Sequence, residues 1–237
     1  MSKGLIVAID GPAGSGKSTS AKLIAQKLGY IYIDTGAMYR AITYLALQNE
    51  AIGDNSRIIE LARKSKIDLK LEDGEVIVLL NNQDVSREIR SSEVNVHVSD
   101  VSKISEVRKL LVEKQRELGA REDGVVMEGR DIGTVVFPNA DVKIFLTASL
   151  DIRADRRAKE YIEKGSSVHV DDIKDNLSNR DKIDSSRIDS PLTKAEGAVE
   201  VDTTNVSIDQ QVNLILDEVK KIAKKKNIKL KIDKPAK

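Results

Sequence analysis

Residues 4–19 read GLIVAIDGPAGSGKST, a stretch that contains the start of the fold. Its apolar run at 5–10 closes on an acid, which is typical of a strand buried on both faces of a parallel sheet. Helical spacing follows from 17 to about 28. A second strand at 30–34 and a second helix at about 37–47 come next, and this alternation predicts an α/β fold.

Residues 11–18, GPAGSGKS, match the phosphate-loop pattern G-x-x-x-x-G-K-[ST] between a strand and a helix. Glycines let the backbone fold closely around phosphate oxygens, while loop N–H groups and the helix N-terminus face the negative charge. Lys17 can reach the β and γ phosphates, and the Ser18 hydroxyl can bind Mg²⁺. A glycine turn without a ligand is disfavoured, because the strand, the lysine and the serine are all in register. We therefore predict that the protein binds a nucleoside triphosphate with Mg²⁺. The predicted contacts are Gly11, Pro12, Ala13, Gly14, Ser15, Gly16, Lys17, Ser18 and Thr19.

The composition argues against several kinds of partner. The 237 residues include 39 basic and 38 acidic side chains, so a net charge of +1 gives no field that attracts nucleic acid or a membrane. The chain has no cysteine, which rules out disulfides and suits a reducing cytosol, and no tryptophan for stacking single-stranded nucleic acid. We expect a cytoplasmic protein, since the N-terminal apolar run is too short to span a membrane and lacks a cleavage site.

The middle of the chain interrupts the α/β pattern. Two β-rich runs, IDLKL and VIVLL, flank the turn at 72–75 within residues 67–85 and predict an antiparallel hairpin. Such a hairpin inside a βαβ chain indicates an inserted small lobe. We then expect helices at 101–118 and 151–164, strands at 125–127, 142–146 and 199–201, a polar and charged segment at 165–191, and a last helix near Ser207, whose spacing to Gln210 fits a capping box.

The phosphate loop leaves the second substrate open. A GTPase would carry an N-K-x-D motif, which this sequence lacks, and an ATP-driven motor is usually larger. The stretch DTGAMYR offers Thr35, Tyr39 and Arg40 as donors to an anion, although a helix cap and a core tyrosine are the ordinary explanations of the first two. Arg130 and Arg180 recur at the ends of later elements. Several arginines in a chain with almost no net charge predict a second phosphate site, and hence a kinase for a small molecule.

The catalytic groups expected for such a kinase are cations. An acceptor that is itself a phosphate monoester needs no strong general base, because its second pKa is about 6. The two histidines, His97 and His169, are isolated and are expected to be structural or on the surface. Arg153, Arg156 and Arg157 share a charged helix, and as a group they predict a lid that excludes water, although each alone could be an ordinary solvated side chain. The predicted catalytic residues are Lys17, Arg130, Arg153 and Arg157.

Four stretches together resemble the bacterial cytidylate kinases: GPAGSGKST, DTGAMYRAI, GRDIGTVVFPNADVKIFL and NRDKIDSSRIDSPL, in order from about residue 4 to residue 222. GRDIGTVVFP is much more specific than the phosphate loop. The resemblance implies a P-loop core with a five-stranded parallel sheet flanked by helices (about 1–34, 101–152 and 190–223), an inserted nucleoside-monophosphate lobe with a small antiparallel β-sheet (35–100) and a lid (153–189). The basic tail at 224–237 lies beyond the resemblance, and a solvated helix end explains it better than an anionic partner does.

The resemblance also assigns acceptor residues. It gives Arg40 and Arg130 to the CMP phosphate, Thr35 and Tyr39 to its surroundings, Arg180 and Asp184 to the phosphate and sugar, and Ser99, Arg108, Asp131 and Arg187 to the cytosine. Cytosine offers an N4 donor beside two acceptors, whereas uracil offers an O4 acceptor beside an N3 donor. A carboxylate and an arginine therefore fit cytosine and disfavour uracil. Glu128 ends its strand where a carboxylate can contact Mg²⁺ through water, although Asp is the residue expected there.

The resemblance implies ATP-dependent phosphorylation of CMP and dCMP, in pyrimidine nucleotide metabolism, by a monomer. In this interpretation the neighbours Arg130 and Asp131 contact different parts of one ligand; in a solvated turn they would simply cancel one another. Two alternatives stay open. One is a kinase for UMP or AMP. The other is a nucleotide-regulated binding protein that uses its basic tail for an acidic partner, which is disfavoured because such a switch has no need of a second phosphate site.

Overall fold

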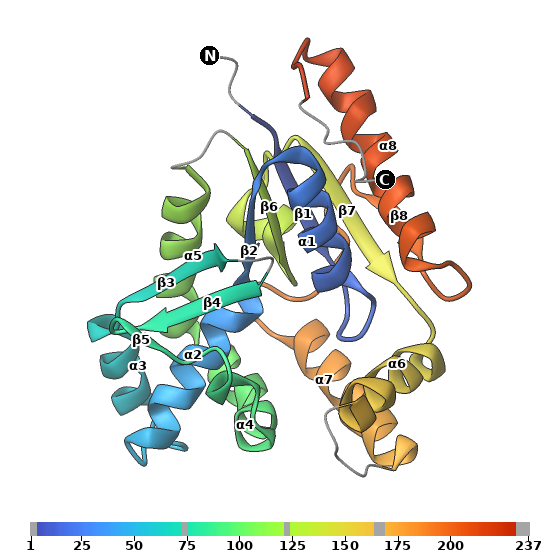
Figure 1. The fold of residues 1–237 in the computed structure, drawn as a ribbon. Coiled ribbons are helices and arrows are strands. Elements are labelled where there is room, and N and C mark those ends of the chain that lie inside the picture. The colour runs from blue at the N-terminus through green and yellow to red at the C-terminus, as the bar shows by residue number, and fades with distance from the viewer. Residues whose placement is uncertain (1–3, 73–74, 121–123, 164–168, 231–237) are drawn as a thin grey trace.

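The protein is built on a five-stranded sheet with the order β2-β6-β1-β7-β8, in which every pairing is parallel (Figure 1). A computed structural model describes residues 4–72, 75–120, 124–163 and 169–230. The predicted fold, a parallel sheet of five strands with flanking helices, is confirmed. The strands are β1 (Ile6–Asp10), β2 (Ile31–Asp34), β6 (Val125–Gly129), β7 (Val142–Thr147) and β8 (Val199–Asp202).

Helices cover both faces of this sheet. α1 and α8 pack on one face, against Val7 and Val126, whereas α5 and the short π-helix η2 pack on the other, against Ala8 and Met127. Successive strand residues point to opposite faces, so the unbroken apolar runs of β1 and β6 supply both cores. In the described part of the chain, no helix combines the length and the apolar character needed to cross a bilayer. The four helices are α1 (Lys17–Leu28), α5 (Ser105–Ala120), η2 (Ile132–Val136) and α8 (Ile208–Lys225).

Local sequence explains where α1 ends and α8 begins. Gly29 has a left-handed conformation (φ 65°) after α1, and its N–H reaches the carbonyls of the last turn. α8 begins with the predicted capping box, in which the Ser207 and Gln210 side chains each accept the other residue's backbone N–H. Both ends were therefore predictable from a few neighbouring residues.

The segment between β2 and β6 lies to one side of the parallel sheet (Figure 1). It packs around a separate apolar core. It contains an antiparallel sheet of order β3-β4-β5, where the sequence predicted a hairpin of two strands. The extra strand follows a tight turn at Asn81 and Asn82, whose φ values of 51° and 69° asparagine tolerates. The predicted turn residues Asp73 and Gly74 lie outside the described residues. The elements are α2 (Thr35–Gln48), α3 (Asn55–Lys64), β3 (Ile67–Glu72), β4 (Glu75–Leu80), β5 (Gln83–Asp84), η1 (Glu88–Arg90) and α4 (Ser92–Lys103).

Two helices differ from the sequence-based expectation. The helix expected at 101–118 is two helices, α4 and α5, because Ile104 between them is extended (φ −67°, ψ 112°). α2 begins at Thr35, two residues early, because the Asp34 carboxylate accepts the N–H of Ala37 at 2.9 Å. Thr35 is therefore not the cap.

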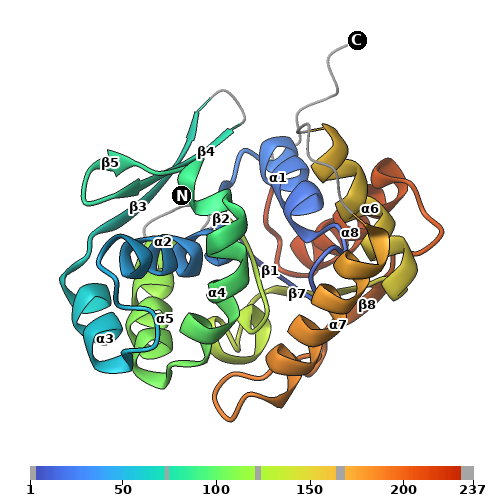
Figure 2. The same ribbon diagram turned by 90° about the horizontal axis from the view of Figure 1, so that it is seen from below.

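The charged helix α6 (Leu150–Glu163) packs against α7 (Val170–Ser186). The sequence predicted α6 but described 165–191 only as polar. α7 was missed because polar and charged residues dominate it and only two of its apolar side chains, Ile173 and Leu177, are buried. The α6–α7 pair and the segment from α2 to α4 lie on opposite sides of the molecule, with α4 facing α7 (Figure 2). Both border the carboxyl ends of the strands, where open α/β sheets bind ligands.

Candidate active site

The carboxyl ends of the strands border a cavity of about 360 Å³. Eight basic and five acidic side chains line it, so positive charge is concentrated there in a chain whose net charge is only +1. A cavity of this kind suits an anionic ligand. The basic residues are Lys17, Arg40, Arg108, Arg130, Arg156, Arg157, Arg180 and Arg187, and the acidic residues are Asp34, Glu128, Asp131, Glu160 and Asp184.

The glycine-rich loop forms one wall of the cavity. Gly11 has φ +148°, and a Cβ there would lie 2.1 Å from the carbonyl oxygen of Leu146, so only glycine fits. Lys17 is 5% exposed, and its Nζ donates to the Pro12 carbonyl at 2.7 Å. Burial lowers the pKa of Lys17, and the positive charge of Arg130 lowers it further. Six of the nine predicted ATP contacts line the cavity: Ala13, Gly14, Gly16, Lys17, Ser18 and Thr19. The other three, Gly11, Pro12 and Ser15, do not line it.

Glu128, at the end of β6, meets Ser18 at the start of α1. The Ser18 hydroxyl donates a hydrogen bond to Glu128 Oε1, and the Tyr32 hydroxyl donates to the same oxygen at 3.1 Å. Burial raises the pKa of Glu128, and the nearby Asp34 raises it further. Hydroxyl and carboxylate oxygens are the ligands that Mg²⁺ prefers, so this pair fits the ion predicted here. No sequence motif pointed to Tyr32, which reaches Glu128 only because β2 and β6 are neighbours.

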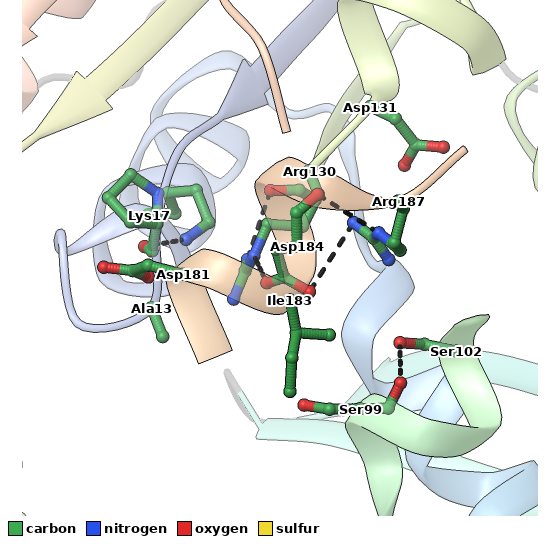
Figure 3. Close-up of polar contacts among 12 residues, drawn as sticks. Ala13, Lys17, Ser99, Ser102, Arg130, Asp131, Asp181, Ile183, Asp184 and Arg187 are labelled. Atoms are coloured by element: carbon green, nitrogen blue, oxygen red, sulfur yellow. Dashed lines mark hydrogen bonds and ion pairs between the residues drawn. The ribbon is translucent and has the colours of Figure 1, made fainter. Parts of the chain in front are cut away.

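Arginines from three separate segments converge beside the loop. Arg130 Nε donates to Asp184 Oδ2 at 2.8 Å, and Arg187 lies 3.6 Å from the other oxygen of that carboxylate (Figure 3). Arg40 forms an ion pair with Asp34 at 2.8 Å. Arg180 of α7 lines the cavity, and its buried Nε has no hydrogen-bond partner among the described residues. Burial, with Arg130 nearby, lowers the pKa of Arg180 to about 10.

The far end of the cavity contains a buried ion pair. Arg108 Nη2 donates to Asp131 Oδ2 at 2.6 Å, and both side chains are at most 5% exposed. Arg108 also donates to the Ser102 carbonyl at 3.1 Å and lies over the Tyr39 ring, 5.1 Å from its centre. The predicted residue Ser99 lines the same end and accepts, through its carbonyl, the Ser102 hydroxyl (Figure 3).

Arg130 and Asp131 are neighbours in sequence but have different partners. Arg130 bonds Asp184 of α7, and Asp131 bonds Arg108 of α5. The alternative of a self-cancelling pair in a solvated turn is wrong, because both side chains are largely buried. Close by, the Thr35 hydroxyl donates to the Glu128 carbonyl at 2.7 Å and so ties α2 to the end of β6.

The three arginines predicted on the lid helix separate into two kinds. Arg156 and Arg157 line the cavity, with Arg156 donating to both oxygens of Thr203 at 3.0 and 2.6 Å. Arg153 is buried behind it, where it donates to the Ala13 carbonyl at 3.1 Å and pairs with Asp181 at 2.7 Å. Arg153, one of the predicted catalytic residues, therefore does not line this cavity and instead ties the phosphate loop to α7.

The sequence also missed a contact from the far end of the chain. Gln211 of α8 donates to the Ser20 hydroxyl at 2.6 Å and to the Gly16 carbonyl at 3.2 Å, so it braces the loop where α1 begins. No motif marks this residue. Of the predicted structural residues, His97 is partly buried on α4 and His169 is exposed before α7, and neither lines the cavity formed by the described residues.

A buried strand, a glycine-rich loop with an inward lysine, and an arginine-lined cavity at the switch point of a parallel sheet define a P-loop phosphotransferase. The described fold and this site place the protein in that class. More narrowly, the chain belongs to the cytidylate kinase family, because the family model described as cytidylate kinase matches residues 7–221.

Relatives of similar length support this membership. The chain is 51% identical to the cytidylate kinase of Lactobacillus johnsonii, over 93% of this chain and 95% of that protein. It is 50% identical to the cytidylate kinase of Bacillus subtilis, over 92% of this chain and 98% of that protein. Among solved structures, an uncharacterized protein from Eubacterium ventriosum shares the fold at 12% identity, with a TM-score of 0.53 over 92% of this chain and 99% of that one.

Proposed function

We propose that the protein transfers the γ-phosphoryl group of ATP to CMP, giving ADP and CDP, and that dCMP is a second acceptor. Family membership makes the protein a phosphotransferase, and the named relatives are cytidylate kinases. The observation that carries the assignment within this cavity is the convergence of Arg40, Arg130 and Arg180 next to the buried Arg108–Asp131 pair.

ATP is proposed to lie on the side of the phosphate loop. Loop N–H groups would surround its phosphates, and Lys17 would exchange its bond to the Pro12 carbonyl for the β and γ phosphates. Arg157 would face the transferred group from α6. Mg²⁺ would be held by Ser18 and, through water, by Glu128, and when bound it neutralises charge on the phosphate oxygens.

The acceptor is proposed to lie between α2, α4 and α7. Arg40, Arg130 and Arg180 would bind its phosphate, Thr35 and Tyr39 would border it, Asp184 would bind the sugar, and Ser99, Arg108, Asp131 and Arg187 would contact the base. At the base end, a guanidinium donor lies beside a carboxylate acceptor at 2.6 Å. The carboxylate can accept from the N4 amino group of cytosine, and the guanidinium can donate to its acceptors. Uracil has an acceptor at O4 and a donor at N3, so it does not match these two groups.

The chemistry needs positioning and charge rather than a general base. An oxygen of the acceptor phosphate forms a bond to the γ-phosphorus, while the bond from that phosphorus to the β–γ bridging oxygen breaks. The cations must offset the repulsion between two anions and hold the oxygens in line. Arg180 is suited to this task because it lines the cavity and its buried Nε has no hydrogen-bond partner among the described residues.

We also propose that different segments of the chain form the acceptor lobe and the lid. Residues 35–100 would form the acceptor lobe and 153–189 a lid, both closing on the core to exclude water. We also expect the protein to be a monomer. We expect it to be cytoplasmic, and the absence of cysteine suits a reducing compartment of that kind.

One assay tests the function: ADP release with ATP and Mg²⁺ and a panel of CMP, dCMP, UMP, AMP and GMP. We expect CMP and dCMP to turn over fastest. Faster turnover of UMP or AMP would overturn the substrate assignment, and ADP release that does not depend on any acceptor would overturn phosphoryl transfer to a monophosphate.

A further inference from the structure

A buried carboxylate joins the phosphate loop to the segment that carries Arg130 and Asp131. Asp10 is the last residue of β1, and it is 3% exposed. Its Oδ1 accepts the N–H of Ile132 at 2.8 Å, and its Oδ2 accepts the N–H of Gly133 at 2.7 Å. One side chain thus holds the two residues that directly follow Asp131.

These two N–H groups are the first of η2, and the first N–H groups of a helix have no partner within the helix. The residue before a helix often caps them with its own side chain. Here that residue is Asp131, which makes no such bond because its carboxylate is paired with Arg108. Asp10 supplies the missing acceptor from another strand and thereby leaves Asp131 free for Arg108.

Both ends of this connection are fixed in place. Asp10 lies in the middle of the sheet, paired with Gly129 on one side and Phe145 on the other. Gly133 has little spare room, since a Cβ there would lie 3.3 Å from Asp10 Oδ2 and 3.2 Å from the Ala195 Cβ. Burial raises the pKa of Asp10 to about 6, so at neutral pH the carboxylate is ionised and can accept both bonds.

We propose that Asp10 is a positioning residue for base selection: it holds the backbone after Asp131 at the angle that lets the Asp131 carboxylate meet the acceptor base. The inference rests on the proposed function, because it concerns how CMP is preferred over UMP. Asp10 itself does not line the cavity described here and acts through its neighbours.

The test compares Asp10→Asn with the wild type. Asparagine has the same shape, but its amide group turns one acceptor into a donor that faces an N–H. We expect kcat/KM for CMP to fall about tenfold and the CMP-to-UMP preference to fall by a similar factor, with KM for ATP changing less than about twofold. A change in the KM for ATP as large as that for CMP, or an unchanged preference, would overturn the inference.

Asp141→Asn is the matched control. Asp141 also accepts a backbone N–H of β1, that of Ile6 at 2.7 Å, but at the opposite end of the strand. Its other oxygen pairs with the Lys226 ammonium, so in this variant the amide oxygen can still accept the Ile6 N–H and only the ion pair is lost. The variant carries the same substitution and should keep the CMP-to-UMP preference. A preference lost equally in both variants would mean a general effect on folding and would overturn the role of Asp10.

A second variant approaches the contact from the other side. Gly133→Ala keeps the Asp10 carboxylate but crowds it, so the preference for CMP should fall here too, and an unchanged preference would count against the inference. This variant also carries the test if Asp10→Asn does not fold. A wild type without preference for CMP would instead contradict the proposed function itself.

Discussion

At the scale of single residues, two side chains that are adjacent in sequence form ion pairs with elements far apart in the chain. Arg130 forms an ion pair with Asp184 of α7, and Asp131 forms one with Arg108 of α5. Both carboxylates are buried and paired, and breaking such a pair leaves an unpaired buried charge, which usually costs several kcal/mol. The sequence therefore suggested that the neighbouring arginine and aspartate have different roles, but it did not show which residues they pair with.

Asp131→Asn should damage the use of CMP far more than the use of ATP. The change removes the charge that faces Arg108 and puts an amide donor where the base offers one, so we expect kcat/KM for CMP to fall about 100-fold. KM for ATP should stay within about twofold. Steady-state kinetics with each substrate varied in turn will measure both, and Asp100→Asn, on the exposed face of α4, is the control that should leave them unchanged. Unaltered kinetics for CMP would remove Asp131 from the acceptor site.

At the scale of elements, the site depends on ties between helices that are distant in sequence. Arg153 of α6 donates to the Ala148 and Ala13 carbonyls and pairs with Asp181 of α7. The sequence predicted that α6 carries functional arginines, since they recur along one charged helix. It could not predict that Arg153 is turned inward, because that depends on where α7 and the phosphate loop pack against α6.

Arg153→Lys should weaken this connection while keeping the charge beside Asp181. The lysine ammonium has three donors on one nitrogen, so it cannot reproduce the contacts that the guanidinium makes from two separate nitrogens. We expect kcat to fall about tenfold and KM for ATP to rise several-fold, with KM for CMP little changed, because the lost bond is to the phosphate loop. Lys174→Gln provides the comparison: it breaks an exposed ion pair with Asp151 between the same two helices, and such pairs contribute little. If both variants show the same kcat and the same KM for ATP, the hydrogen bond from Arg153 to the phosphate loop does not contribute to ATP binding.

At the scale of the whole molecule, charge is distributed unevenly. The chain is nearly neutral, yet the cavity at the carboxyl ends of the strands has more basic than acidic side chains. Arg180 is a clear case, since burial and the neighbouring Arg130 disfavour its charged form. A site built for anions in this way is less stable when empty than a neutral site would be, and binding of phosphate groups offsets the difference.

Arg180→Met should therefore separate stability from function. Removing a buried and repelled charge is expected to raise the Tm of the unliganded protein by a few degrees, while kcat for CMP falls about 100-fold or more. Thermal unfolding with and without CMP measures the first effect together with ligand binding, and the CMP-induced rise in Tm should shrink. Arg63→Met on the surface of α3 should change neither quantity. An unliganded Tm below that of the wild type would contradict the idea that Arg180 is strained in the empty site.

Elements with a local cause could be predicted from the sequence. The glycine-rich loop, the end of α1 and the capping box of α8 depend on residues within a few positions of one another, and so does the alternation that gives a parallel sheet. The family pattern added which arginines to consider. The folded chain was needed to show how these arginines pair, that Tyr32 and Gln211 support the site, and that Asp10 caps η2 from another strand. Hydrogen bonds and ion pairs act over a few ångströms of space, and residues as far apart as Asp10 and Ile132 become neighbours only when β1 and β6 pair.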